Sequence, residues 1–206
     1  MIPLHLDSLD INRQKVFREL KAFQPDGILA GGTAIALQIG HRKSYDFDIF
    51  TDSPLTPNLW TKVKKIFGKG VVKTMSTKKQ LNFVTPENIS ITFFHDEVKP
   101  LYPEIQTRFI DLANLRDLAS NKAFTIGQRG KWRDYVDLYF LLKSELVTLD
   151  QIINDCSKRT NGETFPVKLF LEQLVYFEDL TVSDIYFIGP IIEPREIKKF
   201  LSLCVY

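Results

Sequence analysis

The stretch LAGGTAIALQIGHRKSYDFDIF, residues 29–50, decides the fold class. Its pattern predicts a short apolar strand, two glycines, an apolar helix that Gly40 stops, a basic turn and a second strand. Because Gly31 and Gly32 directly follow a strand, the backbone can turn tightly there and approach a ligand closely. The N–H groups at the start of the next helix suit a phosphate, and Thr33 adds a hydroxyl.

Two carboxylates follow on the second strand. Asp46 and Asp48 are two residues apart, so on a strand over 46–50 they share one face, while Phe47 points into a core. Neighbouring carboxylates repel each other and are tolerated best when they share a hard cation such as Mg²⁺. Two glycines after a strand are most often a simple turn, and an Asp-x-Asp pair is most often solvated. The combination, with 13 residues between Gly32 and Asp46, is far more specific.

The rest of the chain predicts an α+β fold. The first half alternates short β-rich runs with helical patterns, and we expect strands at 27–30, 46–50, 71–75, 81–85, 89–94 and 107–112. We expect helices at 11–23 and 32–39, one from Pro57, one at 132–143, and others begun by Asn114, Thr148, Pro166 and Pro194. The expected organisation is a small mixed sheet with flanking helices over 1–112, then a helical region over 113–206 packed on it.

Composition excludes several classes of protein. The 206 residues include 27 Lys and Arg against 25 Asp and Glu, which excludes a histone-like polycation but not a local basic patch. No apolar run approaches the roughly 20 residues that a membrane helix needs, and the acidic N-terminus lacks the pattern of a signal peptide. Two cysteines, Cys156 and Cys204, do not make a disulfide framework. We therefore expect a cytoplasmic protein with two reduced thiols and no membrane segment.

A second polar constellation lies in DLASNKAFTIGQRGKWRDYVDLYFLLK, residues 117–143. Lys122 interrupts the apolar face of the first predicted helix, so its ammonium must either reach out to solvent or meet an anion. Asp134 and Asp137 are neighbours on the next helix, where Arg133 could form a structural ion pair with Asp137.

Together, residues 29–50 and 117–143 resemble the AbiEii/AbiGii toxin family of nucleotidyltransferases, in the superfamily that includes DNA polymerase β. The resemblance implies a nucleotidyltransferase core that moves an NMP from an NTP to a hydroxyl acceptor with Mg²⁺ or Mn²⁺. It also implies an RNA or tRNA 3′ end as acceptor, a role as the toxin of a type IV toxin–antitoxin system, and a protein antitoxin as partner.

By that resemblance, Asp46 and Asp48 would hold the metal, and Lys122 and Asp134 would join them as catalytic residues. The implied nucleotide-binding residues are Gly31, Gly32, Thr33, Arg42, Ser44, Lys122 and Arg129. Asp117, Arg129 and Asp137 also match motif positions, with helix capping and ion pairs between helices as alternatives.

One departure from the superfamily pattern favours an alternative function. Many members have a third carboxylate on a later strand as the base for the acceptor hydroxyl. On the predicted strand 89–94 the corresponding face presents Ser90, Thr92 and Phe94, and only Asp96 continues the same parity. Either Asp96 or Asp134 is then the base, or deprotonation is left to metal and solvent, or catalysis is impaired. The last case gives the alternative function, a non-catalytic relative that binds nucleotide or nucleic acid and acts through a protein partner.

Residues 61–80 contain seven lysines and no acid. Such a run is either a solvated surface or a track for a nucleic-acid backbone. Aromatic residues on helices are more often part of a core or interface than platforms for bases. Trp132, beside the basic turn, is the one that we single out as a candidate to stack on a base.

Overall fold

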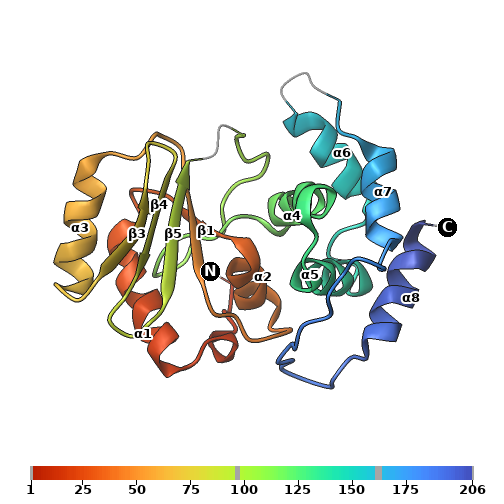
Figure 1. Cartoon of the computed structure of the whole chain (residues 1–206), viewed down its shortest axis with the longest axis horizontal. Helices are drawn as coiled ribbons and strands as arrows, with labels where there is room; N and C mark the ends of the chain where they lie inside the picture. Colours follow the sequence, from red (N-terminus) through yellow and green to blue (C-terminus); the bar gives the residue numbers. More distant parts are fainter. Residues whose placement is uncertain (1, 96–97, 161–163, 206) are drawn as a thin grey trace. The chain divides into compact units, whose positions relative to one another are not determined.

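The computed structural model describes residues 2–95, 98–160 and 164–205 (Figure 1). It divides into two compact units, and each is considered by itself. The first comprises Met1–Lys99 and Pro103–Ala113, and the second comprises Pro100–Tyr102 and Asn114–Tyr206.

The first unit is built on a mixed sheet. Its strands are β1 (Ile28–Ala30), β2 (Phe47–Thr51), β3 (Val72–Ser76), β4 (Gln80–Val84) and β5 (Ser90–His95), in the spatial order β1-β2-β5-β4-β3. β2 and β5 are parallel, and the other neighbouring pairs are antiparallel. The helices of this unit are α1 (Ile11–Glu19), α2 (Gly31–Ile39) and α3 (Pro57–Phe67). The expected α+β class and mixed sheet are confirmed.

Helices α1 and α3 lie beside the sheet (Figure 1), and aromatic side chains pack between them and one of its faces. Phe17 of α1 stacks on Phe47 of β2 with ring centroids 6.3 Å apart, and Phe67 of α3 lies 5.7 Å from Phe83 of β4. Alternate residues of each central strand are buried on this face, as period-2 patterning requires. Burial of each such ring stabilises the fold by roughly 1.5–3 kcal/mol. Because these rings hold one face of each strand against the helices, the alternate residues of the strand must lie on the opposite face of the sheet.

The strand expected at 107–112 does not form. Leu112 makes only single-residue bridges, one to Leu29 and one to Ile105. The preceding residues close on themselves, because the Asp111 carboxylate accepts the Thr107 backbone N–H at 2.8 Å and the Thr107 hydroxyl donates to the Ile110 carbonyl at 2.9 Å. This side-chain capping competes with a ladder of strand hydrogen bonds.

The second unit is helical, as expected. Its helices are α4 (Leu115–Arg129), α5 (Trp132–Lys143), α6 (Leu149–Arg159), α7 (Val167–Val175) and α8 (Pro194–Val205). The predicted caps are confirmed for α4 and α6, since the Asn114 side chain accepts the Arg116 N–H at 3.0 Å and the Thr148 hydroxyl accepts the Gln151 N–H at 3.2 Å. Among the described residues, we find no helix whose length and apolar character would let it cross a bilayer.

Candidate active site

The glycine turn lies directly against a carboxylate. Gly31 is the first residue of α2 and has a φ of +65°, a conformation that residues with a side chain rarely adopt. A Cβ added there would lie 2.5 Å from Oδ2 of Asp48. Ala30, just before the turn, is the register partner of Asp48 across β1 and β2. The backbone at the start of α2 therefore approaches Asp48 as closely as only glycine allows.

The second aspartate lies just before the strand. β2 begins at Phe47, one residue later than predicted, so Asp48 is within the strand and Asp46 precedes it. Phe47 and Ile49 are fully buried, whereas Asp48 is half-buried and Asp46 is exposed. The alternation expected from the sequence is thus confirmed, with the carboxylates on residues that alternate with the core.

Buried hydroxyl groups fix this segment from behind. The Thr33 hydroxyl hydrogen-bonds to that of Ser44 at 2.7 Å and donates to the backbone carbonyl of Asp46. The Ser44 N–H donates to the Ser8 carbonyl at 2.9 Å. Arg42 is also buried, and its guanidinium donates to the Lys43 carbonyl at 2.9 Å. The structure thus gives Thr33, Ser44 and Arg42 hydrogen bonds that hold the aspartate segment, and their predicted contacts with nucleotide stay predictions.

A polar row extends from Asp48 across the sheet. Thr92 of β5 is the parallel register partner of Asp48, and Asn82 of β4 is the partner of Thr92. The Gln80 side-chain amide donates to the Asn82 side chain at 2.9 Å. The register position beside Asp48 on β5 is therefore taken by Thr92 and not by a carboxylate. Asp96, the alternative base, lies outside the described residues.

The amides of Asn82 and Gln80 were not among the residues singled out from the sequence. The signal that could have found them is alternation within 80–84, where Leu81 and Phe83 are buried and the residues between them are not. That alternation shows which face of the sheet Asn82 lies on. It does not show the register between β4 and β5, and it is this register that places Asn82 beside Thr92.

The donor set at this site fits a divalent metal that is shared with a nucleotide. Mg²⁺ prefers oxygen ligands and is commonly held by one or two carboxylates, with phosphate and water oxygens completing its shell. Among the described residues, no group of three or more His, Cys, Asp or Glu side chains could enclose a metal without such help. Two aspartates beside a helix N-terminus therefore suit a metal that arrives with a triphosphate.

The second unit contains a buried charge cluster. Lys122 of α4 donates to the Asp134 carboxylate at 2.6 Å and lies 2.7 Å from that of Asp137, both on α5. Lys122 is 8% exposed and Asp137 is fully buried. Burial by itself lowers the pKa of Lys122, but the carboxylates of Asp137 and Asp134 outweigh it, so the pKa lies above its ordinary value. Of the two fates expected for Lys122, contact with anions is the one observed.

A comparison with protein families gives a match that spans both constellations. The family model for the nucleotidyl transferase AbiEii toxin of type IV TA systems matches residues 16–184. The chain belongs to the AbiEii family of nucleotidyltransferase toxins. Its membership covers both the Gly31–Asp48 region of the first unit and the charge cluster of the second.

A relative and two solved structures show how far the likeness of this AbiEii-family chain extends. An uncharacterized protein of Aquifex aeolicus (strain VF5) is 31% identical over 156 residues, which is 75% of each chain. A crystal structure from H. pylori, assigned as a nucleotidyltransferase, matches with a TM-score of 0.59 and 21% identity over 95% of this chain and 92% of that one. JHP933 from Helicobacter pylori matches with a TM-score of 0.58 and 21% identity over 95% and 89%. These two structures support the nucleotidyltransferase fold.

The remaining motif positions of the AbiEii chain have structural partners. The buried Asp117 carboxylate accepts the backbone N–H groups of Leu101 at 2.8 Å and Tyr102 at 3.1 Å, so it anchors that loop. Arg129 ends α4, and its side chain lies outside what the structure describes. Sequence reasoning missed Asp155, which is fully buried and receives two hydrogen bonds from Arg116, at 2.8 and 2.9 Å. A separation of 39 residues left no local signal for that pair.

The prediction that Trp132 stacks on a base is wrong. Its side chain is 3% exposed and forms part of the core of the second unit. As the first residue of α5, it lies at the end of the basic turn in sequence but points inward.

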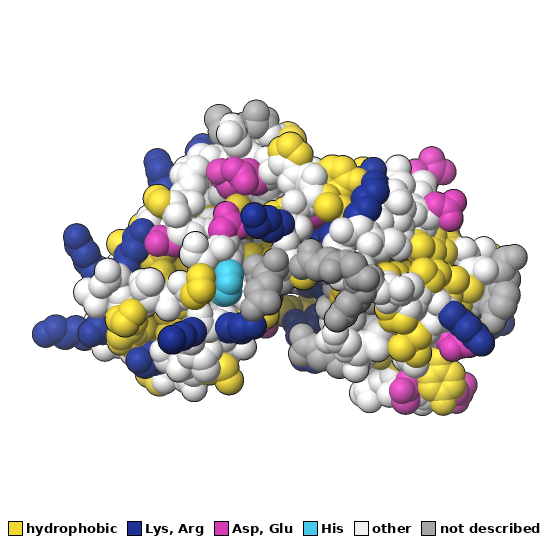
Figure 2. Space-filling model, turned by 90° about the horizontal axis from the view of Figure 1, so that it is seen from above, with side chains coloured by type: hydrophobic (Ala, Val, Ile, Leu, Met, Phe, Trp, Pro, Cys, Tyr) yellow, Lys and Arg dark blue, Asp and Glu magenta, His cyan; other side chains and the backbone are white. Residues whose placement is uncertain are grey.

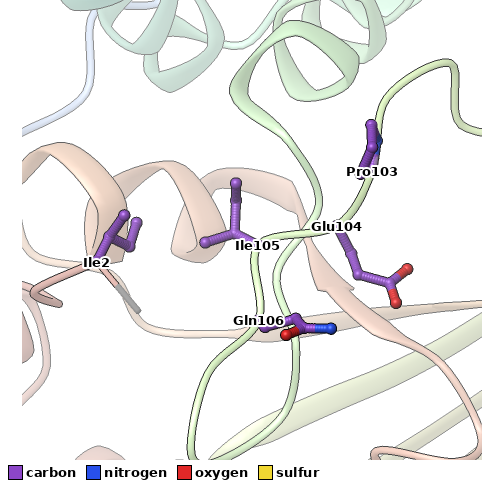
Figure 3. Close-up of a pocket in the computed structure, with 5 residues that line it drawn as sticks. All are labelled: Ile2, Pro103, Glu104, Ile105 and Gln106. Carbon is purple, nitrogen blue, oxygen red and sulfur yellow. The ribbon is translucent and has the colours of Figure 1, made fainter.

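A hollow of about 550 Å³ in the first unit has none of the predicted site residues in its lining (Figure 3). It is lined by Ile2, Pro103, Glu104, Ile105 and Gln106. Glu104 is the one ionisable side chain in that lining, so the hollow offers no pair of groups for metal or acid–base chemistry.

Proposed function

We propose that this AbiEii-family protein moves a nucleoside monophosphate from an NTP to the 3′ hydroxyl of an RNA, with tRNA as the first candidate acceptor. Asp46 and Asp48 would hold a Mg²⁺ or Mn²⁺ ion, and the start of α2 would receive the triphosphate. The observation that supports this most strongly is the close approach of Gly31 to the Asp48 carboxylate, at the N-terminus of a helix.

The chemistry assigned to these residues is a displacement at phosphorus. The acceptor hydroxyl gives its proton to a carboxylate or to solvent, its oxygen bonds to the α-phosphorus, the bond from that phosphorus to the bridging oxygen breaks, and pyrophosphate leaves. A bound divalent ion supplies positive charge at the phosphates. The backbone N–H groups of Gly31 and Gly32 would orient the phosphate oxygens, as helix N-termini do. Thr33 and Ser44 would act as positioning residues, because their hydroxyls hold the segment that contains Asp46.

Lys122 and Asp134 belong to the proposed catalytic set on different evidence. A buried cation with two buried carboxylate partners is expensive to assemble, because each charge loses its hydration. Stability alone seldom justifies such a cluster, and a well-packed apolar group would often serve as well. We propose that the cluster is maintained for activity, with Lys122 in contact with nucleotide phosphate and Asp134 as the second acid.

Membership in the toxin family supports a biological role. We propose that the protein acts as the toxin of a type IV toxin–antitoxin pair and that a protein antitoxin opposes it. Modification of an RNA 3′ end would explain toxicity, since a changed end blocks the normal use of that RNA.

A labelling assay tests the proposal. Purified protein, Mg²⁺ and total cellular RNA would be incubated with each α-labelled NTP in turn. We expect label in a defined RNA class from wild-type protein and none from Asp46→Asn or Asp48→Asn. The matched control is Asp52→Asn, an exposed aspartate four residues beyond Asp48 on the same chain segment, which should label normally. Full labelling by both site variants would contradict the proposed metal site.

The position of Thr92 favours a second candidate function. With a threonine beside Asp48 instead of a carboxylate, the protein could bind nucleotide without turning it over and act through a partner. Binding of an NTP with Mg²⁺, together with no labelled product in any RNA, would support this alternative. A labelled acceptor would exclude it.

A further inference from the structure

A cluster of exposed lysines lies at the α3 and β3 end of the first unit. The lysine surface comprises Lys64 and Lys65 of α3, Lys69 in the following turn, Lys73 of β3 and Lys78 at the β3–β4 turn. All five side chains are exposed, and dark blue side chains project from this end of the molecule in Figure 2. The nearby Lys62 pairs with Asp26 at 2.5 Å. Within the described part of the chain, none of the five makes an ion pair with a carboxylate.

The charge of this region differs from that of the rest of the chain. Residues 53–86 contain seven lysines, no arginine and no acid, which gives +7. The whole chain has a formal charge of +2, so the other residues sum to −5. A protein with near-balanced charge has thus concentrated its positive potential on one helix, one edge strand and the turns between them. Such a field attracts polyanions and raises their association rate.

An aromatic ring organises the centre of the surface. The Nζ atom of Lys73 lies 5.0 Å from the centroid of the Trp60 ring, and that of Lys64 lies 6.0 Å from it. Trp60 is half-buried and packs edge-on against Phe83 of the core, with centroids 6.1 Å apart. Two ammonium groups from different elements are therefore held near one fixed ring by cation–π attraction. Lysines around a partly exposed aromatic ring are typical of surfaces that follow a single strand of nucleic acid.

The surface lies on the same sheet as the proposed active site. β3 is the edge strand, and the row from Asp48 runs through Thr92 and Asn82 to Met75 of β3. Trp60 and Lys73 lie on the face of the sheet that packs α3, whereas the row that begins at Asp48 lies on the opposite face. An RNA held by the lysines would therefore pass around the β3 edge and cross three strand spacings, about 14 Å, to present its end near Asp48.

We propose that the lysine surface binds the phosphate backbone of the RNA acceptor, with Trp60 positioning Lys64 and Lys73. The choice of RNA rests on the proposed function, in which the acceptor is an RNA 3′ end. The charge of the surface and its single-strand character rest only on the structure, so binding can be tested apart from transfer.

The test is fluorescence anisotropy with a 5′-labelled single-stranded RNA of about 20 nucleotides, without NTP or metal. Each phosphate neutralised on a single strand contributes about −0.7 to the slope of log K against log salt. Five lysines therefore predict a slope near about −3.5 and a roughly 100-fold loss of affinity between about 50 and 200 mM KCl. The double variant Lys64→Gln, Lys73→Gln should reduce the slope to about −2 and the loss to roughly 20-fold.

The second unit offers a matched control. Lys143 and Lys198 also lie over aromatic rings, those of Phe200 at 5.1 Å and Phe177 at 5.3 Å. The double variant Lys143→Gln, Lys198→Gln removes the same charge and the same kind of contact elsewhere. It should leave the affinity and the salt slope at their wild-type values. An equal effect from both double variants would show a dependence on net charge alone and would overturn the assignment of a site.

Tryptophan fluorescence gives a second readout, because the chain has two tryptophans. In a Trp132→Phe variant the emission comes from Trp60 alone, and we expect it to change as RNA is added. In a Trp60→Phe variant only the buried Trp132 remains, and its emission should not respond. A response from Trp132 and none from Trp60 would overturn the proposal.

Two further outcomes would overturn the proposal, and one comparison separates it from the proposed function. No binding of RNA at the lowest salt would leave the surface for another partner, such as an acidic protein. Equal or tighter binding of duplex DNA, with the same dependence on Lys64 and Lys73, would reject RNA as the ligand. The Asp48→Asn variant should bind RNA normally while transferring nothing. If the wild-type protein binds RNA through these lysines but transfers nothing to any acceptor, the proposed RNA-binding surface stands and the proposed nucleotidyl transfer is rejected. If the lysine variants transfer label and bind RNA as tightly as the wild type, the proposed transfer stands and the proposed surface is rejected.

Discussion

Replacing Gly31 with alanine should destabilise the first unit and remove nucleotidyl transfer. A residue with a side chain at the φ of +65° found here pays about 1–2 kcal/mol for the left-handed conformation. The added Cβ would also lie 2.5 Å from Oδ2 of Asp48, whereas ordinary contact begins at 3.4 Å. The carboxylate must therefore move by about 0.9 Å. Displacements of about 1 Å at a reacting centre cost on the order of 100-fold in rate.

The assay combines urea denaturation, followed by circular dichroism, with transfer of label to RNA. We expect Gly31→Ala to lose about 1–2 kcal/mol of unfolding free energy and at least 100-fold in transfer rate. The matched control is Gly127→Ala in α4, where an added Cβ meets nothing within 4 Å. That variant should gain about 0.5–1 kcal/mol, because alanine favours a helix over glycine. A Gly31→Ala protein with wild-type stability and activity would refute the claim that Asp48 and this turn form one site.

Three further predictions concern the charge cluster, the thiols and the missing carboxylate. Lys122→Met should lower the free energy of unfolding by about 3–5 kcal/mol at neutral pH, since it leaves buried carboxylates without a cation. Because the pKa of Lys122 is raised in the folded protein, the extra stability of the wild type should persist up to pH 10.5, the ordinary pKa of this group, and disappear as the pH rises through the folded pKa. Urea unfolding at a series of alkaline pH values measures this loss. Burial raises the pKa of the Cys156 thiol to about 12. In variants that keep one cysteine each, a disulfide reagent at about pH 8 should therefore modify the half-buried Cys204 faster than Cys156. Equal modification rates would contradict the burial of Cys156. Thr92→Asp introduces a third carboxylate about 4.8 Å along the sheet from Asp48. It should therefore lower the stability of the metal-free protein and enlarge the rise in Tm on adding Mn²⁺. A rise in Tm equal to that of the wild type would contradict the register between β2 and β5.

The sequence predicted most of the local structure because the relevant signals are local. Gly40 ends α2 in the left-handed conformation expected of a residue just beyond a helix. The range predicted for α5 agrees with the structure at both ends. The basic turn before the helix and the apolar pattern along it leave little choice for where the helix begins and ends. The strand expected at 107–112 failed because hydrogen bonds from Thr107 and Asp111 close that segment into a loop, and strand propensity does not register such capping.

The candidate site was predictable in its residue types but not in its contacts. Spacing gave Gly31, Asp46 and Asp48, yet the closeness of Gly31 to Asp48 depends on the antiparallel register of β1 and β2. The pairing of Lys122 with Asp134 joins two helices, and the pattern on one helix could show only that Lys122 needs an anion. The exposure of Trp132 was misjudged because successive residues at the start of a helix point in different directions, so Lys131 is exposed while Trp132 beside it is buried.

The central claim is that Asp48 supports transfer of the α-phosphate group of an NTP to an RNA 3′ hydroxyl. The most direct measurement compares α-labelled and γ-labelled forms of the preferred NTP on the same RNA, before and after periodate oxidation of its 3′ end. Wild-type protein should transfer label only from the α position and only to the unoxidised RNA, while Asp48→Asn transfers none and Asp52→Asn behaves as wild type. Label from the γ position, or undiminished transfer by Asp48→Asn, would contradict the account.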